Sequence, residues 1–253
     1  MSDAEPGYTP DDMMTVAAAR ALRSGDVCFV GIGLPSTAAN LARRLHAPGV
    51  VLIYESGCIG AKPTRLPSSI GDGVLAEHAD VLVGVPEIFS YWLQAGRIDI
   101  GFLGAAQIDR FGNLNTTVIG PYEDPTVRLP GAGGAPEIAA NCRRVIVTLR
   151  HSRRTMVDEI DFVTSIGHGS GNERSELGIR GEGPVAVITD LGIMRPDPTS
   201  RELVLTDVHP GVPVSAVEVA TGWPLRVAPD VTETDAPSAA ELEALAALRG
   251  SGG

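Results

Sequence analysis

One carboxylate stands where a nucleophile or a general base would be expected. Glu55 directly follows the apolar run Val50–Tyr54. Ser56 and Gly57 come next and could lie near a substrate, because the carboxylate stands where a buried strand gives way to a loop. In open α/β sheets, ligands bind beyond the carboxyl ends of the strands. Partial burial at such a place would tune the pKa and reactivity of the carboxyl group. From this position alone, a solvated acid at a strand end is the alternative interpretation.

A cluster of small residues is the second candidate for chemistry. The segment Pro130–Ala135 reads Pro-Gly-Ala-Gly-Gly-Ala. Clustered glycines let a backbone approach a ligand closely and turn its N–H groups toward an anion or an oxyanion. The candidate residues for this role are Gly131, Gly133, Gly134 and Ala135. The segment lacks the Gly-Lys-Ser/Thr of a Walker loop and the preceding strand of a Rossmann fingerprint. A flexible surface loop is the alternative interpretation.

The remaining side chains give weaker signals. Gln107 follows the apolar run Ile98–Leu103 and could point toward a ligand, although a bond to local backbone is the more common role. The histidines never form a His-x-His or His-x-x-x-His pair, so we expect no metal site. A Gly-x-Ser-x-Gly elbow is absent, which disfavours a Ser-His-Asp hydrolase.

Short apolar runs predict the strands that would position these residues. They are rich in β-branched residues, too short for helices and bounded by turn residues. Because the runs are continuous rather than alternating, we expect an α/β fold with an open, mostly parallel sheet and helices on both faces. The runs are Val27–Ile32, Val50–Tyr54, Val81–Val85, Ile98–Leu103, Val145–Leu149 and Val185–Thr189.

Capping signals predict the helices. Thr9, Pro10 and Asp12 form an N-terminal signature, and Gly25 follows the helical run as a stop. A second helix is expected over Pro35–His46, and a serine followed three residues later by a glutamate opens a last helix near residue 238. We expect a single domain over residues 1–253, with a C-terminal helical tail from about residue 237.

Composition excludes several classes of protein. With 31 acidic and 20 basic residues the net charge is −11, which disfavours nucleic acid and anionic membranes as partners. The sequence shows no secretory signal and no apolar stretch long enough to span a bilayer. Three cysteines without metal-type spacing fit a reduced protein better than a disulfide scaffold. We therefore expect a cytoplasmic location.

Seven short motifs, taken in chain order, resemble the β-type subunit of family I coenzyme A transferases, most closely the glutaconate CoA-transferase type. Each motif is weak alone, but their shared order over nearly the whole chain makes the resemblance specific. The motifs are Gly31–Pro35, Glu55–Gly57, Gly104–Asp109 with Gly112–Asn115, Gly131–Ala135, Ile160–Ser165, Thr189–Ile193, and His209–Val212 with Thr221–Gly222.

The resemblance implies a fold, a reaction and a partner. In that family the glutamate of the Glu-Ser-Gly or Glu-Asn-Gly motif is the covalent nucleophile, and Glu55 occupies its place. The family's glycine loop lies by the active site, which gives Gly131–Ala135 the same expected place. We therefore expect the β-type subunit of an acyl-CoA:carboxylate CoA-transferase, working by a ping-pong mechanism through a glutamyl-CoA thioester. Acyl-CoA and a carboxylic acid would be the substrates, an α-type subunit the partner in a hetero-oligomer, and no cofactor would be bound permanently.

Two alternatives stay open at this stage. Relatives on this scaffold have drifted to decarboxylation or hydrolysis of CoA esters, and Cys58 three residues after Glu55 leaves room for such a change. We expect Cys58 to be a small packing residue. A non-catalytic ligand-sensing α/β domain is the second alternative, although no segment reads as the helix-turn-helix that would favour it.

Overall fold

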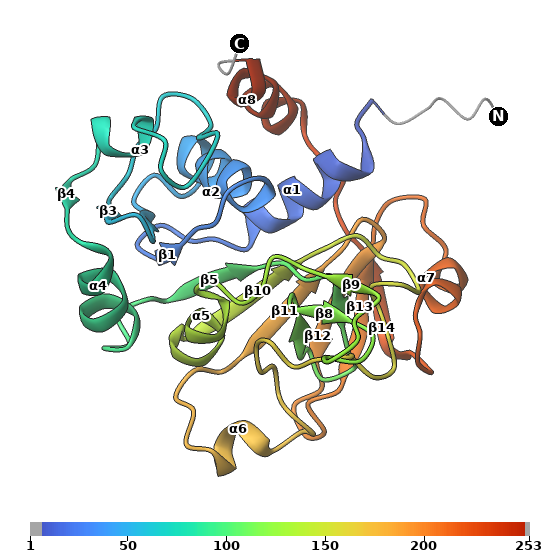
Figure 1. Cartoon of the computed structure of the whole chain (residues 1–253). Coiled ribbons are helices and arrows are strands. Elements are labelled where there is room, and N and C mark those ends of the chain that lie inside the picture. The colour runs from blue at the N-terminus through green and yellow to red at the C-terminus, as the bar shows by residue number, and fades with distance from the viewer. Residues whose placement is uncertain (1–6, 251–253) are drawn as a thin grey trace.

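A ten-stranded sheet forms the centre of the computed structural model, which describes residues 7–250 (Figure 1). The strands follow the order β14-β13-β12-β11-β10-β5-β1-β2-β3-β4. Five adjacent strands, from β11 to β2, run parallel, as do β13 and β14; β3, β4 and β12 are antiparallel to their neighbours. The expectation of an open, mostly parallel sheet is confirmed. The strands are β1 (Val27–Phe29), β2 (Val51–Tyr54), β3 (Cys58–Ile59), β4 (Val81–Leu82), β5 (Ile100–Leu103), β10 (Arg144–Thr148), β11 (Pro184–Ile188), β12 (Gly192–Pro196), β13 (Leu203–Val208) and β14 (Arg226–Glu233).

Two short hairpins and several helices complete the chain. The hairpins pair β6 (Gln107–Ile108) with β7 (Leu114–Asn115) and β8 (Val118–Ile119) with β9 (Val127–Arg128). The helices are α1 (Pro10–Arg20), α2 (Leu34–Leu45), α3 (Val74–Glu77), α4 (Val85–Glu87), the π-helical segment η1 (Ile88–Leu93), α5 (Ala135–Asn141), α6 (Glu173–Glu176), α7 (Val214–Ala220) and α8 (Ala239–Gly250). Within residues 7–250, no helix is long and apolar enough to span a bilayer.

The apolar runs predict the parallel strands well and the sheet edges poorly. Each parallel strand of the central block lies inside its run or within one residue of it. The run Val81–Val85 is not a buried strand: it yields only the edge strand β4, whose side chains at Val81 and Leu82 are 50% and 59% exposed. Strands β12 to β14 carry alternating or partly exposed residues and had no continuous apolar signal.

Helices cover both faces of the sheet, as expected, and the sheet separates two cores. Successive strand residues point to opposite faces. Leu52 and Tyr54 therefore pack in the core under α1, α2 and α8, whereas Ile53 between them packs in the core beside η1, α5 and α7. Figure 1 shows α1, α2 and α8 together on one side of the sheet, and α5 on the other.

Helix packing and ion pairs join the first helix, α1, to the last, α8. The Thr9 hydroxyl accepts from the amide of Asp12, whose carboxylate accepts from the amide of Thr9, so the expected capping box is present. Helix α1 ends at Arg20, before the expected stop, and the Arg20 guanidinium binds both carboxylate oxygens of Glu241 over 2.8 and 2.7 Å. Leu245 and Leu248 of α8 are buried in the core that α1 and α2 share. The C-terminal helix therefore packs on the body of the protein.

His151 is buried between hydroxyl groups at the carboxyl end of β10. Its Nδ1 lies 3.1 Å from Oγ1 of Thr189, and its Nε2 lies 3.0 Å from Oγ1 of Thr221. Burial lowers the pKa of the imidazole from 6.5 to about 4, against the opposing effect of the nearby Asp190 carboxylate. The ring is therefore neutral in the folded protein at pH 7.

We expect the free energy of unfolding to fall as the pH drops from 6.5 to about 4. Over this range the unfolded chain takes up a proton at residue 151 that the folded chain does not, so the loss approaches about 3 kcal/mol. Urea unfolding at several pH values should show a shallower pH dependence for His151→Gln than for the wild type. Identical slopes for the two chains would contradict the prediction.

Candidate active site

A tight hairpin turn holds Glu55 at the carboxyl end of β2. The amide of Gly57 donates to the carbonyl of Tyr54 over 3.0 Å, and Tyr54 pairs with Cys58 in the antiparallel strand β3. The turn lies at the edge of the sheet where the parallel strands β1, β2, β5 and β10 end. The expected position of Glu55, at the end of a buried strand, is confirmed.

Gly57 fixes the shape of this turn. Its φ is +106°, and a Cβ atom there would lie 1.9 Å from the carbonyl oxygen of Val83. The amide of Val83 donates to the carbonyl of Gly57 over 3.0 Å, which ties the turn to the chain just before α4. Any side chain at position 57 would clash with this backbone, so Gly57 fixes the position of the glutamate. The proximity of Ser56 and Gly57 to a substrate stays a prediction.

Alternation along β2 directs the side chains around the glutamate. The Tyr54 ring is fully buried, and its hydroxyl lies 2.9 Å from Oγ of Ser36 in α2. Burial raises the pKa of this hydroxyl, which keeps it protonated at neutral pH. Tyr54 thus points to the α2 side of the sheet, away from Glu55, which lies on the α5 side together with Ile53.

The structure brings the glycine loop against the glutamate. Gly134 is the N-cap residue of α5. A Cβ atom at Gly134 would lie 3.1 Å from Oε2 of Glu55 and 2.9 Å from Cζ of Phe89. The two candidates, far apart in the sequence, are therefore neighbours, and the missing side chain at Gly134 leaves room for the carboxylate.

Two of the four candidate residues of the loop have backbone amides without an acceptor in the described part of the chain. Within residues 7–250, the amides of Gly133 and Gly134 donate no hydrogen bond to the protein. By contrast, the amide of Gly131 donates to Thr116 over 2.9 Å, and the amide of Ala135 donates to Ala132 over 3.0 Å. Of the four candidate residues of the loop, Gly133 and Gly134 thus offer N–H groups to a ligand beside Glu55.

A cavity of about 490 Å³ opens beside Glu55. Its lining combines apolar side chains with two carboxylates. Sequence reasoning singled out neither Phe89, which has no signal, nor Glu137, whose place in the first turn after the glycine loop could have indicated it. The lining residues are Glu55, Ser56, Ile70, Val85, Phe89, Gly133, Gly134 and Glu137.

A second cavity, of about 300 Å³, lies on the other side of the glycine loop. Gly131 and Ala135 line this cavity and not the one beside Glu55. The Thr116 hydroxyl there donates to the carbonyl of Gly131 over 2.8 Å, which anchors the loop. The lining residues are Gly104, Ala105, Ala106, Thr116, Leu129, Pro130, Gly131, Ala132 and Ala135.

Gln107 lies in a buried network and lines neither cavity. Its Nε2 donates to Asp161 over 2.7 Å, and its Oε1 accepts from Asn115 Nδ2 over 2.7 Å and from the amide of Asp161 over 3.1 Å. These bonds link β6 and β7 to the chain near residue 161. The proximity of Gln107 to a substrate stays a prediction.

Cys58 packs away from the glutamate. Its side chain is 5% exposed and belongs to the core under α1 and α2. The hydroxyl of Ser56 donates to Cys58 Sγ over 3.8 Å, which is a weak contact. Cys58 is not among the residues that line the Glu55 cavity. In the part of the chain that the structure describes, no cluster of His, Cys, Asp or Glu could hold a metal ion.

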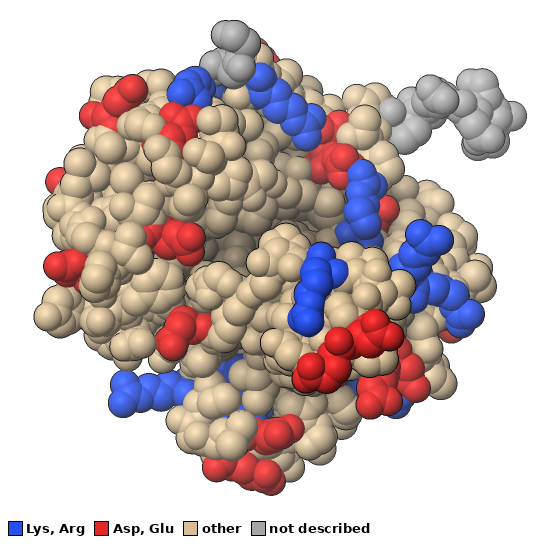
Figure 2. All heavy atoms as spheres, in the orientation of Figure 1, with Lys and Arg blue, Asp and Glu red and all other residues tan. Residues whose placement is uncertain are grey.

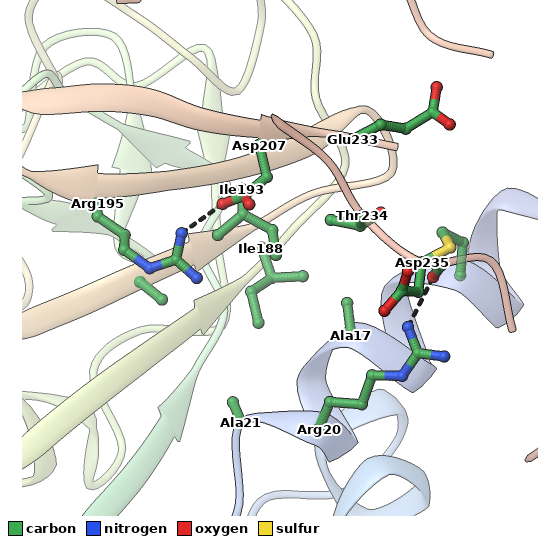
Figure 3. Close-up of a pocket in the computed structure, with 12 residues that line it drawn as sticks. Ala17, Arg20, Ala21, Ile188, Ile193, Arg195, Asp207, Glu233, Thr234 and Asp235 are labelled. Atoms are coloured by element: carbon green, nitrogen blue, oxygen red, sulfur yellow. Dashed lines mark hydrogen bonds and ion pairs between the residues drawn. The ribbon is translucent and has the colours of Figure 1, made fainter. Parts of the chain in front are cut away.

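A further cavity, of about 340 Å³, lies between α1 and the strands β11 to β14 (Figure 3). Ile188 and Ile193 form part of its apolar floor, and charged groups stand around its rim. These groups have partners: Arg20 donates to the carbonyl of Asp235, and Arg195 pairs with Asp207.

Acidic and basic side chains are interspersed on the face shown in Figure 2, without a continuous basic surface.

The chain matches known proteins over most of its length. Residues 11–220 match the coenzyme A transferase family. The chain is 63% identical to the B-type subunit of 3-oxoadipate CoA-transferase from Pseudomonas knackmussii, over 95% of this chain and 93% of the relative. It is 37% identical to the B-type subunit of glutaconate CoA-transferase from Acidaminococcus fermentans, over 93% and 90% of the two chains.

Solved structures show the same fold. The crystal structure of glutaconate coenzyme A-transferase from Acidaminococcus fermentans superposes with a TM-score of 0.89 at 33% identity, over 95% of this chain and 94% of that one. The decarboxylase AibA/AibB gives a TM-score of 0.82 at 26% identity, over 96% of both chains. The resemblance found in the sequence motifs is confirmed. The chain belongs to the coenzyme A transferase family, as a CoA-transferase subunit of the B type.

Proposed function

We propose that Glu55 is the covalent nucleophile of an acyl-CoA:carboxylate CoA-transferase. One observation carries this proposal. The Glu55 carboxylate faces Gly134, and the free amides of Gly133 and Gly134 lie in the same cavity wall. A nucleophile and donors for an oxyanion thus meet at one point, as acyl transfer requires.

The reaction can be written with Glu55 alone as the covalent group. Its carboxylate attacks the thioester carbonyl of an acyl-CoA, and the C–S bond breaks. CoA thiolate is the leaving group, and Glu55 then carries the acyl group as a mixed anhydride. The thiolate then attacks the glutamyl carbonyl, and the acyl group departs as a free carboxylate, leaving a glutamyl-CoA thioester. An acceptor carboxylate reverses the two steps and restores Glu55. No net proton or electron is needed, and the thioester energy is conserved.

The surrounding groups serve this sequence of steps. Each tetrahedral stage places negative charge on a carbonyl oxygen, and one well-placed N–H donor is worth roughly 3–4 kcal/mol to such a stage. The amides of Gly133 and Gly134 are the donors that we assign to this role. Ile70, Val85 and Phe89 form an apolar wall that helps to exclude water, which would hydrolyse either intermediate.

The substrate acid is proposed to be a 3-oxo dicarboxylate of the 3-oxoadipate type. The support is the 63% identity to one subunit of a 3-oxoadipate CoA-transferase, over 95% of the chain. CoA enters as a thioester substrate, and no cofactor is bound permanently. We place the reaction in the cytoplasm, in keeping with the free thiols of Cys28, Cys58 and Cys142.

The partner is proposed to be an α-type CoA-transferase subunit. The relatives are subunits of the B type, and large apolar side chains stay exposed: Val85, which lines the cavity, is 49% exposed, and Tyr91 of η1 is 64% exposed. Large obligate interfaces bury about 2,000 Å² or more, and such a contact would close the open side of the site.

The chain alone should therefore show no CoA transfer from any acyl-CoA to any acid. Mixing it with the α-type subunit should give a stable hetero-oligomer and restore transfer to 3-oxoadipate. The measurement is acyl-CoA formation by each of the two chains separately and by the mixture, beside the mass of the complex in solution. Robust transfer by the isolated chain would refute the need for a partner. Loss of the CoA ester without an acceptor acid would favour hydrolysis or decarboxylation instead.

A further inference from the structure

A second carboxylate lines the Glu55 cavity and has no role in the steps above. Glu137 lies in the first turn of α5, three residues after Gly134, and its side chain is partly buried. Its Oε2 accepts from Nδ2 of Asn141 over 2.9 Å and, more weakly, from Nε2 of Gln94 over 3.4 Å. Both contacts engage the same carboxylate oxygen, Oε2.

The other oxygen of Glu137 has no donor from the chain. Within residues 7–250 no hydrogen bond to its Oε1 is present, and no Lys, Arg or His lines the cavity. A carboxylate near a helix N-terminus is favoured by the helix dipole, which accounts for the residue type but not for the free oxygen. Once substrate and partner cover the cavity, that oxygen loses water and needs a donor.

The substrates limit what the donor can be. The acceptor substrate, a carboxylic acid that is ionised at neutral pH, has no N–H group to donate. Acyl-CoA carries an amide N–H two methylenes beyond its sulfur, about 5 Å from the thioester carbon. Glu137 stands one helical turn, about 5 Å, along α5 from Gly134, which borders the reacting carboxylate. The amide of the CoA arm is thus the substrate donor within reach.

We infer that Glu137 is a binding residue that accepts a hydrogen bond from the first amide of the pantetheine arm and so holds the thioester against Glu55. The inference rests on the proposed function. The contact would form with acyl-CoA and persist in the glutamyl-CoA thioester, because in both the sulfur lies beside Glu55. It would place CoA rather than the acid along the α5 wall of the cavity.

The test combines a changed substrate with a changed residue. The probe is an acyl-CoA in which this amide is replaced by an ester, so that only the N–H is lost. In the αβ complex, wild type should lose about tenfold to about a hundredfold in kcat/KM with the ester analogue, the range expected of a hydrogen bond to a charged group. Glu137→Ala should show a similar loss with natural acyl-CoA and no further loss with the analogue. Glu137→Gln, which keeps a neutral acceptor, should fall between.

The controls separate binding from structure. Glu87 lies exposed on α4 next to the cavity-lining Val85 but does not line the cavity, so Glu87→Ala makes the same change of charge and should retain the full discrimination between the two substrates. Thermal unfolding of each variant reports any loss of α5. If Glu137→Gln or Glu137→Ala lowered kcat/KM equally for both substrates, or if wild type did not distinguish them, the inference would be overturned. The proposed function would still stand if Glu55 remained essential in the same assays.

Discussion

Glu55→Gln should abolish CoA transfer by the αβ complex without unfolding the chain. A neutral amide cannot form the anhydride or the thioester, and the residue lies in a half-buried turn that tolerates an isosteric change. Glu55→Asp should also be damaging, because it retracts the carboxylate by one methylene, and a misplacement of about 1 Å costs about 100-fold. Turnover beside circular dichroism spectra of each variant is the measurement.

The covalent intermediate gives the same prediction a direct readout. Incubation of the complex with acyl-CoA and no acceptor should leave CoA attached to Glu55, as a mass increase on this chain. Borohydride should reduce the thioester and inactivate the enzyme, and hydroxylamine should trap it as a hydroxamate. Cys58→Ala is the matched control and should be mild, because Cys58 packs in the core on the other face of the sheet. Loss of turnover in Cys58→Ala with retention in Glu55→Gln would point to a thiol-dependent lyase or hydrolase.

Gly134→Val should reduce turnover by more than about 100-fold, since a displaced carboxylate or donor costs that much. Its Cβ would stand 3.1 Å from Oε2 of Glu55 and 2.9 Å from the Phe89 ring, so the carboxylate, the ring or the loop must move. Stability should fall much less, because the loop faces an open cavity. Steady-state kinetics and a thermal melt of the complex measure the two effects.

Gly133→Ala is the matched control for the glycine loop. Its φ of +49° is accessible to alanine at a cost of roughly 1–2 kcal/mol, and no atom lies within 4 Å of the added Cβ. The amide that we assign to the oxyanion is retained, so turnover should stay within about tenfold of wild type. Equal activity of Gly133→Ala and Gly134→Val would show that close approach at Gly134 is unimportant.

Local signals in the sequence predict what the chain does over a few residues. The apolar run before Glu55 predicts β2, and Thr9 with Asp12 predicts the start of α1, because both depend on neighbours along the chain. The family motifs add the expected nucleophile. The strands β12 to β14 had no comparable signal, because their residues alternate between buried and exposed or are mostly exposed and so form no continuous apolar run.

The candidate site shows the same limit. The contact between Gly134 and Glu55 depends on how α5 packs over the ends of the strands, which no local pattern expresses. Phe89 lines the cavity from η1, and its sequence neighbours resemble an ordinary apolar helix. Gln107 follows its strand as predicted, yet the Asn115 amide and the Asp161 carboxylate occupy its side chain.

The sheet ends at β4 with an edge that a newly made chain cannot hide by itself. No strand within residues 7–250 pairs with the outer side of β4, and Val81 and Leu82 are half exposed or more. An open sheet edge can pair with the edge of another copy and so cause aggregation. Because β4 is only two residues long, it can form few backbone hydrogen bonds with a strand of another chain. This brevity is a safeguard against aggregation during the interval between synthesis of the chain and its assembly.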